Sequence, residues 1–238
     1  MSRQHTVIVG GSSGIGFATA RQLLELGHQV TITGRSRQRL EVAKKELGGD
    51  LNPVVLDAAE TNRLADAFAG LGEFDHLVLA LGSSKGAGPF ASVSIDEVRQ
   101  GFEEKVFPHF AAAQAALPSL RKDGSITFIS AITAGAAIPG TAGIGAANAA
   151  VAALVPILAA ELRPLRVNGV SPGVIDTPWW DFLTDEQKGP VFADYAAKTP
   201  VGRVGRSQDV AQAITLLISD TFINGHIITC DGGLSLNS

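Results

Sequence analysis

Short apolar runs rich in β-branched residues alternate along the chain with longer segments of helical spacing. The runs are too short for helices and predict seven strands, at residues 6–9, 29–33, 54–56, 76–79, 125–129, 166–170 and 227–229. The segments between them predict helices that end at residue 26 or cover 37–47, 61–68, 95–120, 144–162 and 209–218. Strands that alternate with helices in this way predict an α/β protein with a doubly wound parallel sheet and helices on both faces.

Residues 172–200 interrupt this regular pattern. They contain four prolines, both tryptophans and the only tyrosine, Tyr195, and they predict an irregular segment that forms a mobile lid around residues 174–200. No linker, repeat or low-complexity run divides the rest, so the 238 residues are interpreted as one domain.

Residues 131–160 carry no charge and are numerous enough to span a membrane. Glycines and Pro139 break the first half of this stretch, so a loop followed by a helix buried on most sides is the preferred interpretation. Residues 1–6 lead from a polar start into the first strand without a signal peptide. The chain is therefore expected to be cytoplasmic, with no membrane partner.

Composition excludes several other functions. Apolar residues make up 45% of the chain and charged residues 18%, with a net charge of −4, which excludes disorder and gives no basic excess for nucleic acid. Cys230 is the single cysteine, so no internal disulfide and no thiolate cluster can form. No spacing of histidines and carboxylates indicates a metal site.

The strongest chemical signal is the sequence Gly-Gly-Ser-Ser-Gly-Ile-Gly between the first strand and the first helix. Glycines at this turn allow the backbone to approach a pyrophosphate, whose charge the free amides of the helix N-terminus stabilise. Glycines in tight turns also serve purely steric needs, but this position favours a dinucleotide site. The residues expected to line it are Gly10, Ser12, Ser13, Gly14, Ile15 and Gly16.

The glycine spacing G-x-x-x-G-x-G resembles that of the short-chain dehydrogenase/reductase family, and similar segments extend over nearly the whole chain. Residues 79–82 keep only the glycine of the family's Asn-Asn-Ala-Gly, whereas residues 168–178 closely match the stretch that folds over the nicotinamide. The resemblance implies a Rossmann fold that binds a nicotinamide dinucleotide. It adds four residues to the expected cofactor site: Asp57, Gly82, Ile175 and Thr177.

The end of the second strand distinguishes NADP(H) from NAD. An acidic residue there would bind the ribose 2′-hydroxyl and repel a 2′-phosphate, whereas an arginine pairs with the phosphate. The chain has Arg35 and Ser36 at this place and no carboxylate before Glu41, which favours NADP(H). Taken alone, Arg35 would be interpreted as a solvated loop arginine.

The resemblance fails at the four catalytic positions. Family members use a tyrosine as acid/base, a lysine four residues later, a serine thirteen residues before the tyrosine, and an asparagine on the preceding long helix. Alignment without a gap over residues 140–150 puts Ile144, Asn148 and Ala131 at the first three positions, and the fourth falls on Lys105. Isoleucine and alanine have no proton to donate, so the family's mechanism cannot operate through them.

Other groups are candidates for the missing chemistry. Lys105 and Asn148 amount to an exchange of the family's asparagine and lysine, so Lys105 either restores an ammonium near the nicotinamide ribose or is a chance surface lysine. The hydroxyls of Ser130 and Thr133 either polarise a substrate oxygen or satisfy the local backbone. Two further candidates are Tyr195 and His109. Tyr195 is interpreted mainly as an aromatic residue of the lid, and His109 mainly as a packing residue.

Two functions remain open. The chain is either an atypical oxidoreductase that transfers hydride between NADP(H) and a small apolar carbonyl, alcohol or activated alkene, or a catalytically silent NADP(H) sensor or partner subunit. A lid and nicotinamide-side residues favour the enzyme. The resemblance also implies a homodimer or homotetramer. The aromatic residues that suggest an apolar substrate pocket are Phe90, Trp179, Trp180 and Phe182.

Overall fold

Seven parallel strands form the sheet at the centre of the computed structural model, which describes residues 3–237. Their order from edge to edge is β3 (Leu51–Val55), β2 (Gln29–Gly34), β1 (His5–Val9), β4 (Phe74–Leu79), β5 (Leu120–Ile129), β6 (Arg166–Pro172) and β9 (Ile227–Cys230). The chain order reverses between β1 and β4, so a topological switch point lies at the carboxyl ends of these two strands. The predicted doubly wound α/β fold is confirmed.

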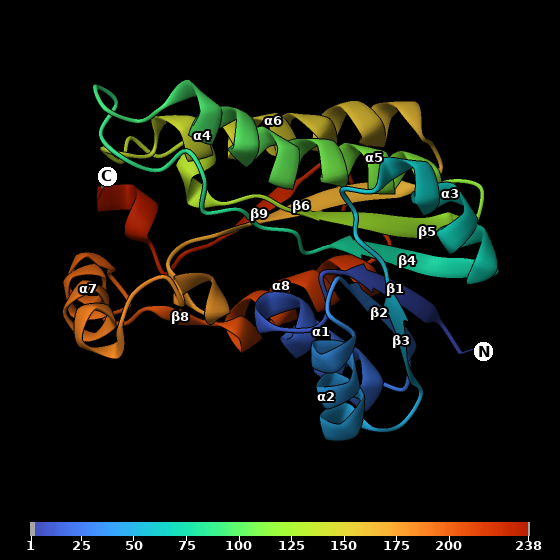
Figure 1. Ribbon diagram of the computed structural model, residues 1–238. Helices are drawn as coiled ribbons and strands as arrows, with labels where there is room; N and C mark the ends of the chain where they lie inside the picture. Colours follow the sequence, from blue (N-terminus) through green and yellow to red (C-terminus); the bar gives the residue numbers. More distant parts are fainter. Residues whose placement is uncertain (1–2, 238) are drawn as a thin grey trace.

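Helices cover both faces of the sheet (Figure 1). The lower layer in that view consists of α1 (Gly14–Glu25), α2 (Arg37–Leu47) and α8 (Ser207–Ser219). The upper layer consists of α3 (Thr61–Gly70), α4 (Ile95–Gly101), the π-helical turn η1 (Phe102–Val106), α5 (Phe107–Ala116) and α6 (Ala142–Glu161). Successive side chains of a strand point to opposite faces, so β1 contributes Ile8 to the core under α1 and α8, and Val7 and Val9 to the core under α5 and α6.

The predicted helix over residues 95–120 is interrupted. The turn η1 separates α4 from α5, and β5 begins at Leu120 instead of residue 125. Pro108 gives the physical reason, because proline has no amide hydrogen for the carbonyl four residues before it. The chain widens there, and the amide of Phe107 donates to the carbonyl of Phe102, five residues back.

Residues 172–200 are more regular than predicted. They contain the short strand β7 (Ile175–Asp176), which pairs with β8 (Gly205–Arg206), the 3-10 turn η3 (Pro178–Trp180) and the helix α7 (Asp185–Lys198). The prediction of an irregular segment is therefore wrong. A helix-start signal was present, since Thr184 and Gln187 form a capping box with hydrogen bonds of 3.0 and 3.4 Å.

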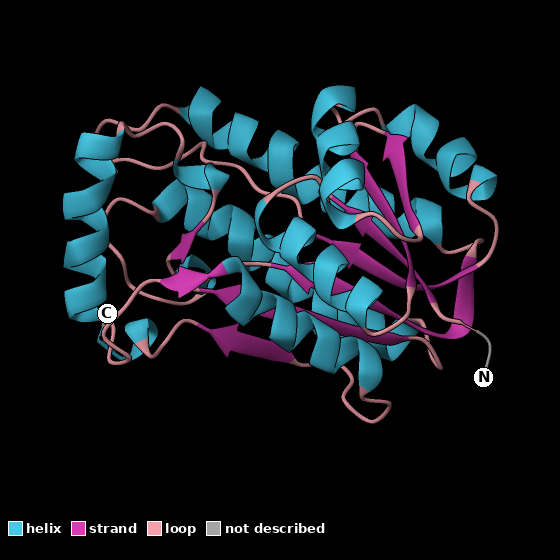
Figure 2. Ribbon diagram, turned by 90° about the horizontal axis from the view of Figure 1, so that it is seen from below, coloured by secondary structure: helices cyan, strands magenta, loops and turns pink. Residues whose placement is uncertain are grey.

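The helix α7 stands away from the sheet (Figures 1 and 2). None of its residues is buried, and aromatic contacts connect it to the segment before it. The ring centroids of Trp180 and Phe192 are 5.5 Å apart, and those of Trp180 and Tyr195 are 6.2 Å apart. An ion pair of 2.7 Å between Lys188 and Asp176 adds to these contacts. A helix with no buried residue is suited to move as a unit.

Among residues 3–237, α6 is the one helix long and apolar enough to cross a membrane, by length and composition only. One side packs Val151 and Val155 into the core, as expected for the uncharged stretch. The opposite side is exposed at Pro156 and Ile157, so the expected burial on most sides is not found in the single chain. The helix continues through Pro156.

Candidate active site

The turn after β1 brings the backbone unusually close to the neighbouring strand. Gly10 has a φ of +86°, a left-handed conformation that glycine adopts without strain. A Cβ at Gly10 would lie 2.5 Å from the carbonyl oxygen of Ala80, and one at Gly16 would lie 2.3 Å from the carbonyl oxygen of Gly10. Only glycine permits this turn, so the steric need and a close approach to a ligand are met by the same residues.

The turn leads into the N-terminus of α1. Ser13 is the N-cap residue, and its side chain makes no capping hydrogen bond. Gly14 and Ile15 form the first turn of the helix, where the backbone amides lack helical partners and attract an anion. Ser12 lies beside the end of β2, since its Oγ is 3.2 Å from the place of a Cβ at Gly34. This arrangement fits a pyrophosphate that links two nucleosides.

Of the predicted residues after β2 and β3, Arg35 keeps a free side chain. It is exposed, and no ion-pair partner of its guanidinium is found in the described part of the chain. Ser36 caps α2, because its Oγ accepts a 3.3 Å hydrogen bond from the amide of Arg39. Asp57 binds its own turn, with Oδ1 accepting from the amide of Ala59 at 3.0 Å.

The segment after β6 crosses from the glycine turn to the loop after β4. At one end, the side chain of Thr177 lies 3.4 Å from the place of a Cβ at Gly14. At the other end, the Trp179 ring lies 3.7 Å from the place of a Cβ at Gly82. The structure therefore brings together three of the predicted cofactor residues, which are far apart in sequence: Gly14, Gly82 and Thr177.

Both tryptophans of this segment use their indole N–H. Trp179 donates to the carbonyl of Ser83 at 3.1 Å, and Trp180 donates to the carbonyl of Ile175 at 3.0 Å. The first bond joins two segments, whereas the second stays within one. Ile175 is predicted to contact the cofactor through its main chain, and its carbonyl oxygen already accepts from Trp180.

Lys105 lies in η1 and is only 5% exposed. Its Nζ donates to the carbonyl of Leu81 at 3.2 Å, in the loop that connects β4 to α4. Burial lowers the pKa of Lys105 to about 8, because the charged amine loses its hydration. The amine therefore exchanges a proton near neutral pH, and the alternative of a surface lysine is excluded.

His109 connects the lysine turn to the sheet. Its Nδ1 is 2.7 Å from the carbonyl oxygen of Lys105, and its Nε2 is 3.2 Å from that of Leu79. Burial, together with the charge of Lys105, lowers the pKa of His109 to about 3, so the ring is neutral and donates one hydrogen bond at a time. Its ring also stacks on Phe128, at 6.0 Å between centroids, which agrees with the packing interpretation.

Asn148 faces the same region from α6, which packs against η1. Its Nδ2 donates to Thr133 Oγ1 at 2.9 Å, and Ser130 Oγ donates to its backbone carbonyl at 2.9 Å. The hydroxyl of Ser130 therefore serves the helix backbone. Asn148 Oδ1 is buried without a hydrogen-bond donor among the described residues. An orphaned buried oxygen is costly and indicates a place for a ligand hydroxyl or a water.

The residues that the family resemblance aligns with the tyrosine and serine positions, Ile144 and Ala131, are apolar, and Ala131 is half-buried. Ile144 is buried at the start of α6, and its amide donates to the carbonyl of Gly86 at 3.1 Å. Ala131 follows β5 in extended conformation. Neither supplies a group that can donate or accept a proton through its side chain.

The predicted pocket aromatics divide into two groups. Trp179, Trp180 and Phe182 lie within 4.8–5.8 Å of one another by ring centroid, and Tyr195 joins them through Trp180. Phe90 lines a different, apolar pocket of about 640 Å³ beside residues 133–142. Tyr195 therefore belongs to the aromatic cluster formed by residues 179–195.

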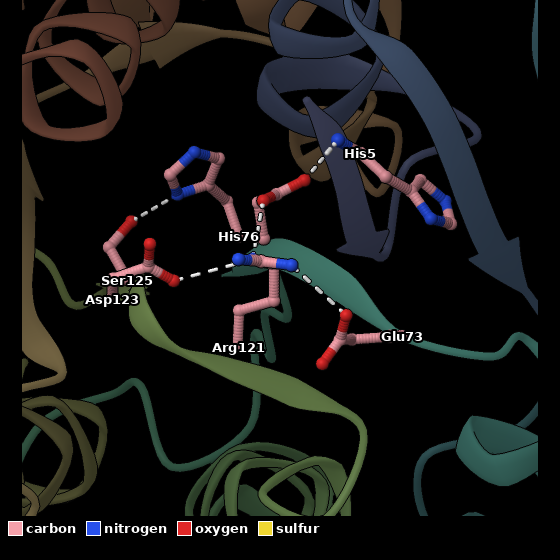
Figure 3. Close-up of polar contacts among 7 residues, drawn as sticks. His5, Glu73, His76, Arg121, Asp123 and Ser125 are labelled. Carbon is pink, nitrogen blue, oxygen red and sulfur yellow. Dashed lines mark hydrogen bonds and ion pairs between the residues drawn. The ribbon is translucent and has the colours of Figure 1, made fainter. Parts of the chain in front are cut away.

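A second polar cluster lies at the amino ends of the strands, opposite the carboxyl ends where the glycine turn lies (Figure 3). Arg121 forms ion pairs with Glu73, Asp75 and Asp123, at 3.1–3.3 Å, and His76 Nδ1 is 2.8 Å from Ser125 Oγ. One guanidinium faces three carboxylates, so the cluster keeps a net negative charge. Within residues 3–237, no group of histidine, cysteine and carboxylate side chains is arranged to hold a metal ion.

Comparison with known proteins agrees with this geometry. A family model described as enoyl-(acyl carrier protein) reductase matches residues 9–235. The chain is 29% identical to a 3-oxoacyl-[acyl-carrier-protein] reductase of Rickettsia bellii, over 98% of both chains. It is 30% identical to a probable 2,4-dienoyl-CoA reductase of Bacillus subtilis, over 100% of this chain and 98% of the relative.

Solved structures show the same similarity. A small-chain dehydrogenase in complex with NADPH superposes with a TM-score of 0.86 at 28% identity, covering 99% of this chain and 100% of that one. A short-chain type dehydrogenase/reductase from Mycobacterium ulcerans gives a TM-score of 0.88 at 29% identity, covering 100% of this chain and 92% of that one.

Proposed function

Because the chain belongs to the short-chain dehydrogenase/reductase family, we propose that it is an NADP(H)-dependent oxidoreductase with a non-standard active site. Its substrate is a small apolar carbonyl compound, the corresponding alcohol, or an activated alkene. The observation that carries this proposal is the buried Lys105 amine at the same end of the sheet as the glycine turn. Reductases among the relatives support the reaction class.

The residues present fit a nicotinamide dinucleotide at two independent places. Gly10, Gly11 and Gly16 have no room for a side chain, so the turn packs tightly and its backbone amides can meet the pyrophosphate. The orphaned Oδ1 of Asn148 needs a donor, which a ribose hydroxyl supplies. Thr177 beside Gly14 extends the site toward the carboxamide end.

The cofactor form is NADP(H) rather than NAD. Arg35 is exposed and unpaired among the described residues, so its guanidinium is free to bind a 2′-phosphate in bidentate fashion. The nearest carboxylate that follows in sequence is Glu41, inside α2. The NADPH complex of a structural relative supports this choice.

The nicotinamide supplies the hydride when it is bound, and the protein must supply or accept a proton. Ile144 and Ala131 stand at the family's tyrosine and serine positions and cannot do so. We assign the proton to Lys105, because its lowered pKa of about 8 makes it a better acid than an ordinary lysine. Asn148 then takes the ribose contact of the missing lysine.

The test is NADPH oxidation by the purified protein with a panel of ketones, aldehydes, quinones and enones. Turnover with any of them supports the enzyme, and Lys105→Met should then lower kcat at least a hundredfold, the scale of a lost general acid. Lys122→Met, an exposed lysine at the opposite edge, should leave kcat unchanged. Equal kcat in Lys105→Met and the wild type would contradict the role of Lys105.

A catalytically silent NADP(H) sensor or partner subunit is the second candidate. It is favoured by the apolar Ile144 and Ala131, and by the Ser130 hydroxyl that is already bound to the helix backbone. Clear NADPH binding, followed by cofactor fluorescence, with no turnover across the panel would establish this alternative.

A further inference from the structure

The loop after β4 is connected to its neighbours at three points. Lys105 Nζ donates to the Leu81 carbonyl at 3.2 Å, and Ser83 Oγ donates to Glu104 Oε2 at 2.7 Å. The Trp179 indole donates to the Ser83 carbonyl at 3.1 Å. The first two bonds come from consecutive residues of η1, and the third comes from the segment before the lid helix.

We propose that Ser83 and Glu104 are positioning residues for Lys105, and that Trp179 connects the lid to them. The consequence for turnover rests on the proposed function. The contacts themselves belong to the free protein and are testable without any substrate.

A lysine side chain with one hydrogen bond is not fixed by that bond alone, because four torsions remain free to rotate. Its place depends on how firmly the Leu81 carbonyl is held. Ser83 holds it, since this residue is 7% exposed and its hydroxyl donates to a carboxylate, which gives a strong, shielded hydrogen bond.

The direction of the Ser83–Glu104 bond is also determined. Ser83 Oγ accepts from the amide of Lys85 at 3.0 Å, so its single proton is directed to Glu104. Glu104 Oε1 accepts from Gln100 Nε2 at 2.9 Å, which leaves Oε2 for Ser83. The Ser83–Glu104 hydrogen bond and the two bonds that orient it therefore form without any ligand.

Of the two neighbouring tryptophans, only Trp179 is hydrogen-bonded to Ser83 among the described residues. Trp179 donates to the carbonyl of Ser83, and the hydroxyl of Ser83 donates to Glu104. Displacement of the segment that carries Trp179 would therefore move the loop after β4. Trp180 binds Ile175 within its own segment and has no such effect. The two neighbours form a matched pair for an experiment.

The first experiment measures the titration of Lys105 by NMR of its 13Cε and 15Nζ nuclei in the free protein. Ser83→Ala and Glu104→Ala should move the pKa of Lys105 upward from about 8 toward the ordinary value of 10.5, because a loosened loop admits water. Ser83→Thr keeps the hydroxyl and should restore the wild-type titration.

Two controls match these variants. Ser92→Ala removes an exposed hydroxyl from the loop between β4 and α4, and Glu103→Ala removes an exposed carboxylate from η1. Both should titrate as the wild type does. An unchanged Lys105 titration in Ser83→Ala and Glu104→Ala, with melting temperatures that show folded proteins, would overturn the inference.

The second experiment measures the same titration of Lys105 in two tryptophan variants. Trp179→Phe removes the indole donor to the Ser83 carbonyl and should raise the pKa of Lys105, whereas Trp180→Phe leaves that bond in place and should titrate as the wild type does. An equal rise in both variants would overturn the role of Trp179. If the wild type never turns over a substrate but Lys105 responds as expected, the positioning inference stands and the proposed reaction fails.

Discussion

At the scale of single residues, the cofactor turn depends on the absence of side chains. Gly16 and Gly10 touch each other through backbone atoms, and a Cβ at Gly16 would lie 2.3 Å from the carbonyl oxygen of Gly10. Real Cβ atoms do not approach that closely, so any substitution at residue 16 must move the turn itself. A displaced turn should bind its ligand more weakly.

Gly16→Ala is therefore expected to weaken NADPH binding at least tenfold, measured by fluorescence titration. Gly70→Ala is the matched control, because a Cβ there meets nothing within 4 Å. The control should bind NADPH as the wild type does and gain a few tenths of a kcal/mol in stability, since alanine restricts the unfolded chain. Equal NADPH affinity in Gly16→Ala and the wild type would show that the turn does not hold the cofactor.

His76 makes folding stability depend on pH. It is 3% exposed, and burial is the main cause that lowers its pKa to about 4, against a contribution of Asp75 that raises it. In the unfolded chain the pKa is 6.5, so between pH 6.5 and pH 4 the unfolded state binds a proton that the folded state does not. The stabilisation is fully present above pH 6.5 and is lost as the pH falls to about 4.

The expected loss amounts to at most about 3 kcal/mol between pH 7 and pH 4, measured as the free energy of unfolding in urea. His76→Asn cannot titrate and keeps a polar partner for Ser125. The variant should be less stable at pH 7 but should lose less of its stability on acidification. Parallel stability curves for the two proteins would contradict the assignment to His76.

Residues whose roles follow from local sequence were predictable, and residues whose roles follow from burial were not. The glycine spacing identified the turn because Gly11 and Gly16 meet neighbours on the adjacent strand or within the turn itself. The burial of Lys105 depends on Leu81 and α6, which lie 24 or more residues away. The orphaned oxygen of Asn148 also depends on distant packing and has no sequence signal.

At the scale of elements, two departures from the predicted pattern surround the site. Pro108 widens the long helix into η1, and that turn presents Glu104 and Lys105 to the same loop. The helix α7 was missed because prolines and aromatics dominate residues 172–200, although Thr184 and Gln187 mark its start. Hydrophobic periodicity cannot reveal a helix that buries no residue.

The cap of α7 predicts a local change in stability. Thr184→Ala removes the side-chain acceptor for Gln187 and should cost this helix about 1 kcal/mol. Amide hydrogen exchange of residues 185–198 should speed up about fivefold, whereas the melting temperature should change little, because α7 has no buried residue.

Ser94→Ala is the matched control, since Ser94 caps α4 by accepting from the amide of Glu97 at 3.1 Å. It should speed up exchange in α4 and leave α7 unchanged. Uniform exchange changes over the whole protein in Thr184→Ala would show that α7 does not open independently.

At the scale of the whole molecule, the outer side of α5 and α6 is unusually apolar for a surface. Phe107 and Phe110 are 50% and 49% exposed on α5, and Ile157 is 58% exposed on α6. α6 packs against η1, the turn that leads into α5, and both helices lie in the same layer of Figure 1. Exposed large apolar side chains from two adjacent helices are typical of a surface that another protein covers.

We expect a second copy of the chain to cover this surface, as the family resemblance implies, in a homodimer or homotetramer. Phe110→Glu and Ile157→Glu should convert the assembly to a species of 24.6 kDa in sedimentation velocity, because a buried unpaired carboxylate is costly in a symmetric interface. Val42→Glu, on the opposite face at α2 and 59% exposed, should leave the assembly intact. A wild-type protein that sediments at 24.6 kDa would show that the surface is not used for self-association.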